Sequence, residues 1–119
     1  MTRFVILHHT QHDGEHWDLM LEHEGVLLTW QLSSNPRGCD FLPIPARRIG
    51  NHRLTYLDYE GPISGNRGVV RRVEAGTVHI TELNDHLCRF MLSGKQIAGA
   101  FRVKARGDQW SFEVDTPAD

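Results

Sequence analysis

The sequence predicts an all-β fold in which many short strands form a sandwich or a barrel. Apolar and polar residues alternate in several short runs, which is the period of a half-buried strand. Glycines divide these runs at positions 61, 65, 68, 76, 94 and 99, as expected of turns between strands. At 119 residues the chain has the usual size of one domain, and we expect a single domain over residues 1–119.

The expected elements follow in chain order. A first strand covers RFVILHH, residues 3–9. Residues 16–32 predict a hairpin with one face in the core, because two alternating runs flank the turn-like sequence EHEG. Its apolar positions are Trp17, Leu19, Leu21, Val26, Leu28, Trp30 and Leu32.

The second half of the chain continues this pattern after a break. SSNPRGCDFLPIPARR, residues 33–48, holds three prolines and predicts a long surface loop. Further strands are expected in HRLTYLDYEG, in GVVRRVEAGTVHITEL and in LCRFMLSGKQIAGAFRVKA. The closing DTPAD is expected to be a frayed tail.

Composition excludes several classes of protein. The formal net charge of −2 is too close to neutral for a protein that coats long nucleic acid by counterion release, so any phosphate contact is local. No apolar run has the length of a membrane span and no signal peptide opens the chain, so a cytoplasmic protein is expected. Cys39 and Cys88 form no CxxC pair and are read as ordinary buried or half-buried thiols.

The distribution of charge is more informative than its total. Residues 8–24 hold five acids and five histidines but no Lys or Arg, whereas residues 47–72 hold six arginines against two acids. The first segment is suited to a cation and the second to an anion.

The acidic and histidine-rich segment predicts a metal site. Residues two apart on a strand share a face, so His16 and Asp18 can converge on one cation opposite the apolar stripe of Trp17. The third ligand is expected from His8, His9 or His12. Two imidazoles and a carboxylate suit Mn²⁺, Zn²⁺ or Fe²⁺. Two alternatives stay open: a solvated polar face, and a helix that carries residues 9, 12 and 16 on one side.

The arginine-rich segment contains a second pair of candidate residues. His52 and Tyr56 are four apart and share a face on an extended chain, and a bulge can displace Leu54, which lies between them on that face. Both side chains can donate to a phosphate oxygen, and His52 can act as a general acid or base. The alternative is a surface histidine and a core tyrosine.

These segments together resemble a known family. FVILHH, HWDLMLE, GVLLTW, HRLTYLDYEGPI and LSGKQIAGAF followed by QW are similar, in order and approximate spacing from Phe4 to Trp110, to the 3′-phosphoesterase domain of bacterial DNA ligase D. The elements HxDxxLE and HxLxYxxxEG make this resemblance fairly specific. It implies a closed β-barrel that trims 3′ ends, removing a terminal ribonucleoside or phosphate with a divalent metal, usually Mn²⁺.

The resemblance assigns roles by position. It places two metal ligands on His16 and Asp18 and a third on His9, with His8 as the alternative. It places the phosphate-side residues on His52 and Tyr56.

Two departures from the family pattern bear on activity. Met20 stands where the family has an arginine that contacts the phosphate, and a thioether neither carries charge nor donates a hydrogen bond. The loop after the EG motif is shortened to SGNRG, which places Arg67 where an aromatic residue is expected. We expect Arg67 to supply the missing positive charge, with Arg47 and Arg48 as the next candidates; the alternative is a solvated loop residue.

The predicted function is a metal-dependent phosphoesterase that acts on 3′ ends of DNA or RNA in end repair. The metal is expected to be Mn²⁺, with Zn²⁺ as the alternative, and to activate water as the nucleophile. His52, Tyr56 and Arg67 are expected to stabilise charge on the phosphate. The alternatives are a non-catalytic module that binds nucleic-acid ends with a disarmed site, and an enzyme for a small-molecule phosphate. We expect a domain without an attached polymerase or ligase, so that such partners are separate proteins.

Overall fold

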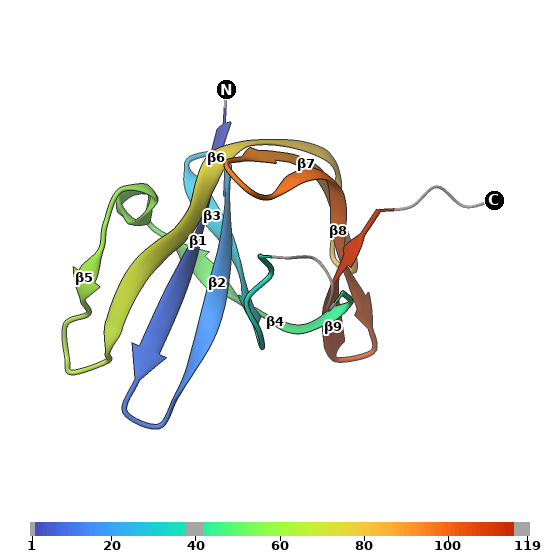
Figure 1. The fold of residues 1–119 in the computed structure, drawn as a ribbon. Coiled ribbons are helices and arrows are strands. Elements are labelled where there is room, and N and C mark those ends of the chain that lie inside the picture. The colour runs from blue at the N-terminus through green and yellow to red at the C-terminus, as the bar shows by residue number, and fades with distance from the viewer. Residues whose placement is uncertain (1, 38–41, 116–119) are drawn as a thin grey trace.

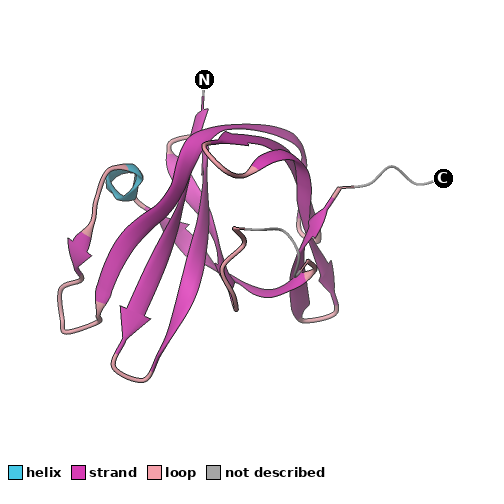
Figure 2. Cartoon of the chain, viewed as in Figure 1, coloured by secondary structure: helices cyan, strands magenta, loops and turns pink. Residues whose placement is uncertain are grey.

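A computed structural model describes residues 2–37 and 42–115, and these residues are almost entirely strand and turn (Figure 2). The strands are β1 (Thr2–Gln11), β2 (Gly14–His23), β3 (Val26–Leu32), β4 (Ile44–His52), β5 (Gly61–Pro62), β6 (Val69–Asn84), β7 (Leu87–Gly94), β8 (Ala98–Arg106) and β9 (Gln109–Val114). A 3₁₀ helix, η1 (Leu54–Leu57), interrupts them once between β4 and β5. The prediction of an all-β fold is confirmed.

Eight of the strands form a ring. The antiparallel order is β1-β2-β3-β4-β9-β8-β7-β6, and pairing of β6 with β1 completes it. The short strand β5 pairs with the first residues of β6, on the edge that β7 occupies further along. Figure 1 shows β5 and the preceding helical turn beside β6, on the outside of the ring.

Side chains on β1 and β2 are buried on both faces of the sheet. Phe4, Ile6, Leu19 and Leu21 point into the ring and join the main core with Trp30. The alternate positions contribute to a second, smaller cluster outside the ring, made of Val5, Leu7, Met20, Leu27, Leu57 and Val70. Leu57 comes from η1, so residues 53–68, here called the cover segment, bury this part of the outer face.

The predicted hairpin of residues 16–32 is confirmed as β2 and β3. Glu24 and Gly25 form its two-residue turn, with φ of 49° and 85°. Positive φ at both turn residues matches the type I′ geometry that suits the twist of a hairpin. The histidine-rich stretch before it is the β1–β2 hairpin, so the helical alternative for residues 9, 12 and 16 is wrong.

The prediction of a strand over HRLTYLDYEG is wrong. β4 ends at His52, and the next residues turn into η1, where the Tyr56 N–H donates to the Arg53 carbonyl at 3.1 Å. The helical turn places Leu57 in the outer cluster, which an extended chain leaving the sheet would not do. Burial of this leucine therefore opposes the strand pattern in the sequence.

Two further boundaries differ from expectation. The C-terminal part of the predicted proline-rich loop is strand, because β4 begins at Ile44 and pairs with β9 opposite Phe112. Residues 38–41 of that loop lie outside the described residues. Gly76 does not end a strand but lies inside β6, where a Cβ atom would be 2.0 Å from the Ser93 carbonyl oxygen. Glycine is needed there because the β6 and β7 backbones approach closely.

One buried carboxylate organises the turn between β7 and β8. Glu74 accepts hydrogen bonds from the backbone N–H groups of Ala75, Lys95, Gln96 and Ile97 at 2.7 to 3.0 Å. Burial opposes ionisation of this group, but the four N–H donors hold the pKa of Glu74 below its usual value. The carboxylate thus ties the β7–β8 turn to strand β6, with both of its oxygens accepting hydrogen bonds.

Cys88 is fully buried, and burial raises the pKa of its thiol to about 12, as expected of an ordinary core cysteine. Cys39 and residues 116–119 of the predicted tail lie outside the described residues. Among the residues that the structure describes, no helix is long and apolar enough to cross a membrane.

Candidate metal and phosphate site

The outer face of the β1–β2 hairpin gathers the predicted metal ligands. His9 on β1 lies directly opposite His16 on β2, and Asp18 follows two residues later on the same face as His16. His8 points to the other face, where its ring stacks on Trp17 with centroids 4.7 Å apart. The structure therefore brings His9, and not His8, to the other two ligands.

The three side chains offer one ligand atom each within 4.8 Å of one another. His9 Nδ1 lies 3.1 Å from His16 Nε2, and Asp18 lies 3.1 Å from His16 Nε2 and 3.7 Å from His9 Nδ1. Ligand atoms about 2.1 Å from a shared cation are roughly 3 to 3.5 Å apart. The triad is thus close to the dimensions of a divalent metal site.

A backbone contact orients the His9 ring toward this site. His9 Nε2 lies 2.7 Å from the carbonyl oxygen of Arg67, in the cover segment. A carbonyl only accepts, so Nε2 carries the proton and the Nδ1 lone pair faces His16 and Asp18. Metal-ligating histidines usually donate their second ring N–H to such a partner.

Asp18 is the buried member of the triad, with 5% of its side chain exposed. Its Oδ1 atom is buried and, although His16 Nε2 lies 3.1 Å away, accepts no hydrogen bond of adequate geometry within the described part of the chain. A buried carboxylate oxygen without a donor is costly unless a cation satisfies it. The residues present therefore fit a divalent metal.

The predicted phosphate-side residues face the same cavity. This cavity has a volume of about 210 Å³, and its walls include the candidate metal ligands His9 and Asp18 together with His52, Tyr56 and Arg67. The remaining walls are Gln11, Met20, Ile63 and Val70. Although His52 and Tyr56 are not on one strand as predicted, η1 turns the chain so that both side chains reach the cavity, with ring centroids 5.6 Å apart.

Hydrogen bonds leave distinct atoms of these residues available. His52 Nδ1 donates to the Gly50 carbonyl at 3.0 Å, which directs Nε2 away from the backbone. The Arg67 guanidinium folds over its own loop, where Nε donates to the Ser64 carbonyl at 2.7 Å and Nη2 to the Ser64 hydroxyl at 3.2 Å. Contacts with Gly50 and Ser64 thus hold the His52 and Arg67 side chains in place.

Gly68 permits the cover segment to return to the sheet next to Arg67. With a φ of 96°, it approaches β1 so closely that a Cβ atom would be 2.1 Å from the Thr10 carbonyl oxygen. Only glycine suits this position. The close return brings the neighbouring Arg67 carbonyl to His9.

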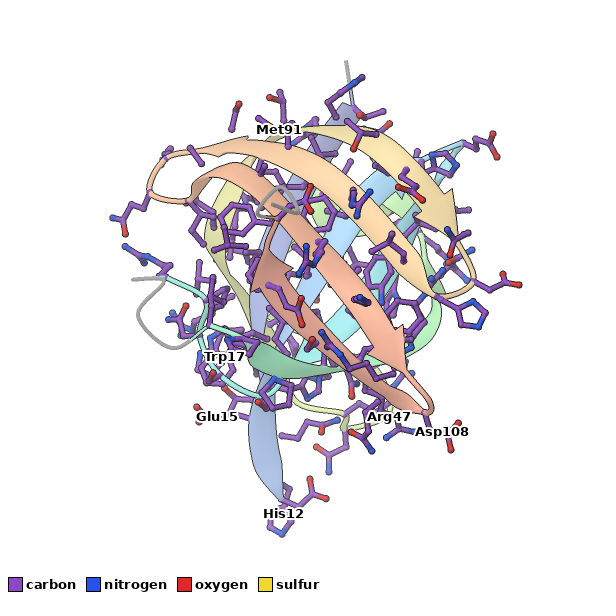
Figure 3. All side chains as sticks on the ribbon, turned by 90° about the vertical axis from the view of Figure 1, so that its right-hand side faces the viewer. His12, Glu15, Trp17, Arg47, Met91 and Asp108 are labelled. Carbon is purple, nitrogen blue, oxygen red and sulfur yellow. The ribbon has the colours of Figure 1, made fainter. Side chains whose placement is uncertain are left out.

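The other basic and histidine candidates lie elsewhere. Arg48 packs over the Trp30 ring at 4.5 Å, and Arg47 lines a separate cavity beside His16. His12 is exposed at the tip of the β1–β2 hairpin and points away from the molecule (Figure 3). His23 lies 3.7 Å from exposed Glu24 at the next turn.

Sequence reasoning missed part of this site. Gln11 lines the cavity two residues after His9, and the period of two along a strand would have identified it. The carbonyl of Arg67 is a backbone partner that no sequence pattern reveals.

Comparisons with known proteins agree with the sequence resemblance. The family model described as the DNA Ligase D 3′-phosphoesterase domain matches residues 7–105. The chain is 30% identical over 116 residues to the multifunctional non-homologous end joining protein LigD of Mycobacterium bovis, and equally to the multifunctional non-homologous end joining DNA repair protein LigD of Mycobacterium tuberculosis. The matched region covers 90% of this chain but 15% of the length of either relative.

Proposed function

From the fact that this chain belongs to the DNA ligase D 3′-phosphoesterase domain family, we propose that it is a metal-dependent phosphoesterase. Its substrates are 3′ ends of DNA or RNA, from which it removes a 3′-phosphate or a terminal ribonucleoside in end repair. One observation carries the proposal: the cavity that exposes His9 and Asp18 of the metal triad also exposes His52, Tyr56 and Arg67.

His9 Nδ1, His16 Nε2 and an Asp18 oxygen hold the metal in this proposal. When bound, a divalent cation supplies Lewis-acid stabilisation of the phosphoryl group and makes water a stronger nucleophile at neutral pH. Two imidazoles and one carboxylate suit Mn²⁺, which we propose as the native metal; Zn²⁺ accepts the same ligands and is compared with it below.

The remaining residues act on the phosphate. His52 uses Nε2 to exchange a proton with the reacting group, because its Nδ1 is committed to Gly50. Tyr56 donates its hydroxyl proton to a non-bridging oxygen, and Arg67 supplies the positive charge at the cavity mouth. Water attacks phosphorus, the bond to the ester oxygen breaks, and that oxygen leaves with a proton.

Met20 favours a second candidate function. It is 1% exposed and lines the cavity where the family has an arginine, so one phosphate contact is replaced by an apolar surface. The alternative is a module that binds metal and a nucleic-acid end without turnover. In either case we propose ligase and polymerase activities as partners at the same end.

The test uses an oligonucleotide with a 3′-phosphate. We expect phosphate release with Mn²⁺, measured against Zn²⁺ and against chelator. His52→Ala should lower turnover by on the order of 10²-fold or more while metal affinity stays within about twofold. Tight binding of the oligonucleotide without release would favour the non-catalytic module, and neither binding nor release would contradict both functions.

A further inference from the structure

A second cavity, of about 430 Å³, adjoins the proposed phosphate site. The two cavities share Tyr56, Ile63 and Arg67 as walls, so they meet along the cover segment. The second one is lined in addition by Arg53, Tyr59 and Pro62. It has the volume of a small-molecule site, whereas the neighbouring 210 Å³ is suited to a group the size of a phosphate.

The walls of this second cavity combine aromatic surface with positive charge. Tyr56 and Tyr59 meet edge to face, with centroids 5.9 Å apart and planes at 88°. The Tyr59 hydroxyl donates to the Pro62 carbonyl, so its polar end is satisfied within the loop. The rings are half-buried against the outer apolar cluster, which leaves part of each ring for contact with a ligand.

The charged residues of the cavity are both arginines. Arg53 and Arg67 are exposed, and none of the lining residues is acidic. Among the described residues, neither arginine forms an ion pair with a carboxylate. The cavity therefore offers aromatic faces between two free positive charges, which suits an aromatic ligand attached to phosphates.

We propose that this cavity binds the terminal nucleoside of the 3′-phosphorylated strand. The base packs on Tyr59 and Tyr56, the 3′-phosphate enters the adjacent metal cavity, and Arg53 contacts the next phosphodiester. Every base has a π face, so such a cavity accepts any base and distinguishes a base-bearing end from an abasic one. This inference rests on the proposed function and adds the terminal nucleoside as the part of the substrate that determines affinity.

A third cavity, which shares His16 with the metal triad, lacks these properties. It lies beside His16, has a volume of about 360 Å³ and carries both Glu15 and Arg47. Apart from His16 itself it has no aromatic wall among the described residues, and the Glu15 carboxylate repels a phosphate. The strand is therefore assigned to the Tyr59 side.

The experiment measures binding, so that it does not depend on turnover. The probes are a deoxyadenosine analogue with a methylenephosphonate at the 3′ position, whose carbon bridge resists hydrolysis, and the matching abasic sugar phosphonate. Titration calorimetry with the Mn²⁺-loaded protein should give at least about tenfold tighter binding of the base-bearing probe. Tyr59→Leu should reduce this ratio to within about twofold, whereas Tyr59→Phe, which keeps the ring, should preserve it.

Two exposed arginines provide a matched control for the path of the strand. A dinucleotide with the same 3′-phosphonate should bind several-fold more weakly to Arg53→Ala, with a shallower salt dependence. Arg47→Ala, beside the other cavity, should leave binding unchanged. Metal affinity and thermal unfolding, measured for every variant, show that the cover segment has kept its place.

The outcomes separate this inference from the proposed function. Equal affinity for the two probes in the parent, or a loss confined to Arg47→Ala, would overturn the nucleoside cavity even if the protein releases phosphate. A base preference that Tyr59→Leu removes supports the cavity even if the parent hydrolyses no 3′-phosphorylated oligonucleotide, and in that case it is the phosphoesterase proposal that fails.

Discussion

Two regions of the molecule each contain a buried carboxylate, and the two carboxylates differ in the hydrogen bonds that they accept. At the β7–β8 turn, Glu74 accepts hydrogen bonds from four backbone N–H groups. Under the cover segment, Asp18 is similarly buried, but its Oδ1 atom accepts none from the described residues. A carboxylate whose oxygens all have hydrogen-bond donors stabilises the fold. A carboxylate with a buried oxygen that lacks a donor, beside two imidazoles, is suited to bind a cation.

The largest expected effect is at Asp18, the carboxylate that lacks a hydrogen-bond donor at Oδ1. Asp18→Asn keeps the shape but removes the charge, and should weaken Mn²⁺ binding by on the order of 10³-fold, beyond the 10- to 100-fold typical of outer-shell partners. The free energy of unfolding without metal should change by less than about 1 kcal/mol, because no hydrogen bond to Oδ1 is lost.

Calorimetric metal titration and denaturant unfolding measure these two quantities. His12→Ala is the control, since that histidine lies at the hairpin tip and should bind metal as the parent does. Unchanged Mn²⁺ affinity in folded Asp18→Asn would remove Asp18 from the metal site.

The next effect concerns the charge that Met20 does not supply. Arg67→Ala should lower turnover of a 3′-phosphorylated end by on the order of 10²-fold, as removal of a charge-stabilising donor does. Addition of Met20→Arg should restore part of this loss, because a guanidinium then reaches the cavity from β2. Steady-state kinetics check both variants.

Two results would revise the role of Arg67. Full activity of Arg67→Ala would mean that its guanidinium is a solvated loop group. A silent parent that Met20→Arg activates would identify the chain as a binding module with a disarmed site.

A smaller effect is expected at Glu74, the carboxylate that accepts four backbone hydrogen bonds. Glu74→Gln places an NH₂ group against backbone N–H donors, and should cost about 2 kcal/mol of unfolding free energy. Mn²⁺ affinity should not change, because the turn lies away from the triad. Urea unfolding and metal titration of the same sample measure both quantities for comparison with Asp18→Asn. A lower Mn²⁺ affinity in Glu74→Gln would contradict the view that Glu74 serves only stability.

The smallest effect is a dependence of stability on pH. The pKa of Glu74 is lowered, and that of Glu113 falls to about 2 because hydrogen bonds from Ser111, Arg106 and Arg102 outweigh burial. Their contribution to stability is present above the ordinary value of 4.5 and is lost as the pH falls toward the lowered pKa.

In metal-free protein, the unfolding free energy should therefore decrease between pH 5 and pH 3. Glu74→Gln should reduce that decrease relative to the parent, because the lowered pKa of Glu74 no longer contributes. An identical acid profile in the two proteins would show that Glu74 does not contribute to the pH dependence.

The sequence predicted the parts of the site that depend on strand period. His16 and Asp18 share a face because the β2 pattern alternates cleanly with Trp17 and Leu19. The sequence did not decide whether His8 or His9 is the third candidate ligand. The preceding run FVIL is apolar at every position, so no polar residue marks the outer face. The two buried faces of β1 explain this pattern.

Other features depend on distant contacts and were not predictable. The turn at η1 is set by burial of Leu57 against β1, β2 and β6 residues, which competes with an apparently strand-like local pattern. The role of Glu74 is set by backbone N–H groups 21 to 23 residues away. Hydrogen bonds to backbone leave no compositional trace in the sequence.

The location of the cover segment outside the ring has a consequence for motion. Among the described residues, the polar ties of the cover segment to the sheet are the Arg3–Asp58 pair at 2.8 Å, the Arg72 N–H to Glu60 bond at 3.0 Å, the His9 contact with Arg67 and the two-residue pairing of β5. Its apolar packing comes from Leu57 and the half-buried Tyr56, Tyr59 and Ile63. The Arg3–Asp58 pair is exposed and contributes little. Opening the segment therefore leaves the eight-strand ladder intact.

Local opening should thus occur at lower free energy than global unfolding. Backbone amides of residues 61–68 should exchange with deuterium well before those at the centre of β7 and β8. Because the His9 ring joins the candidate metal site to this segment, a bound cation should slow that exchange, and the segment in turn should slow loss of the cation.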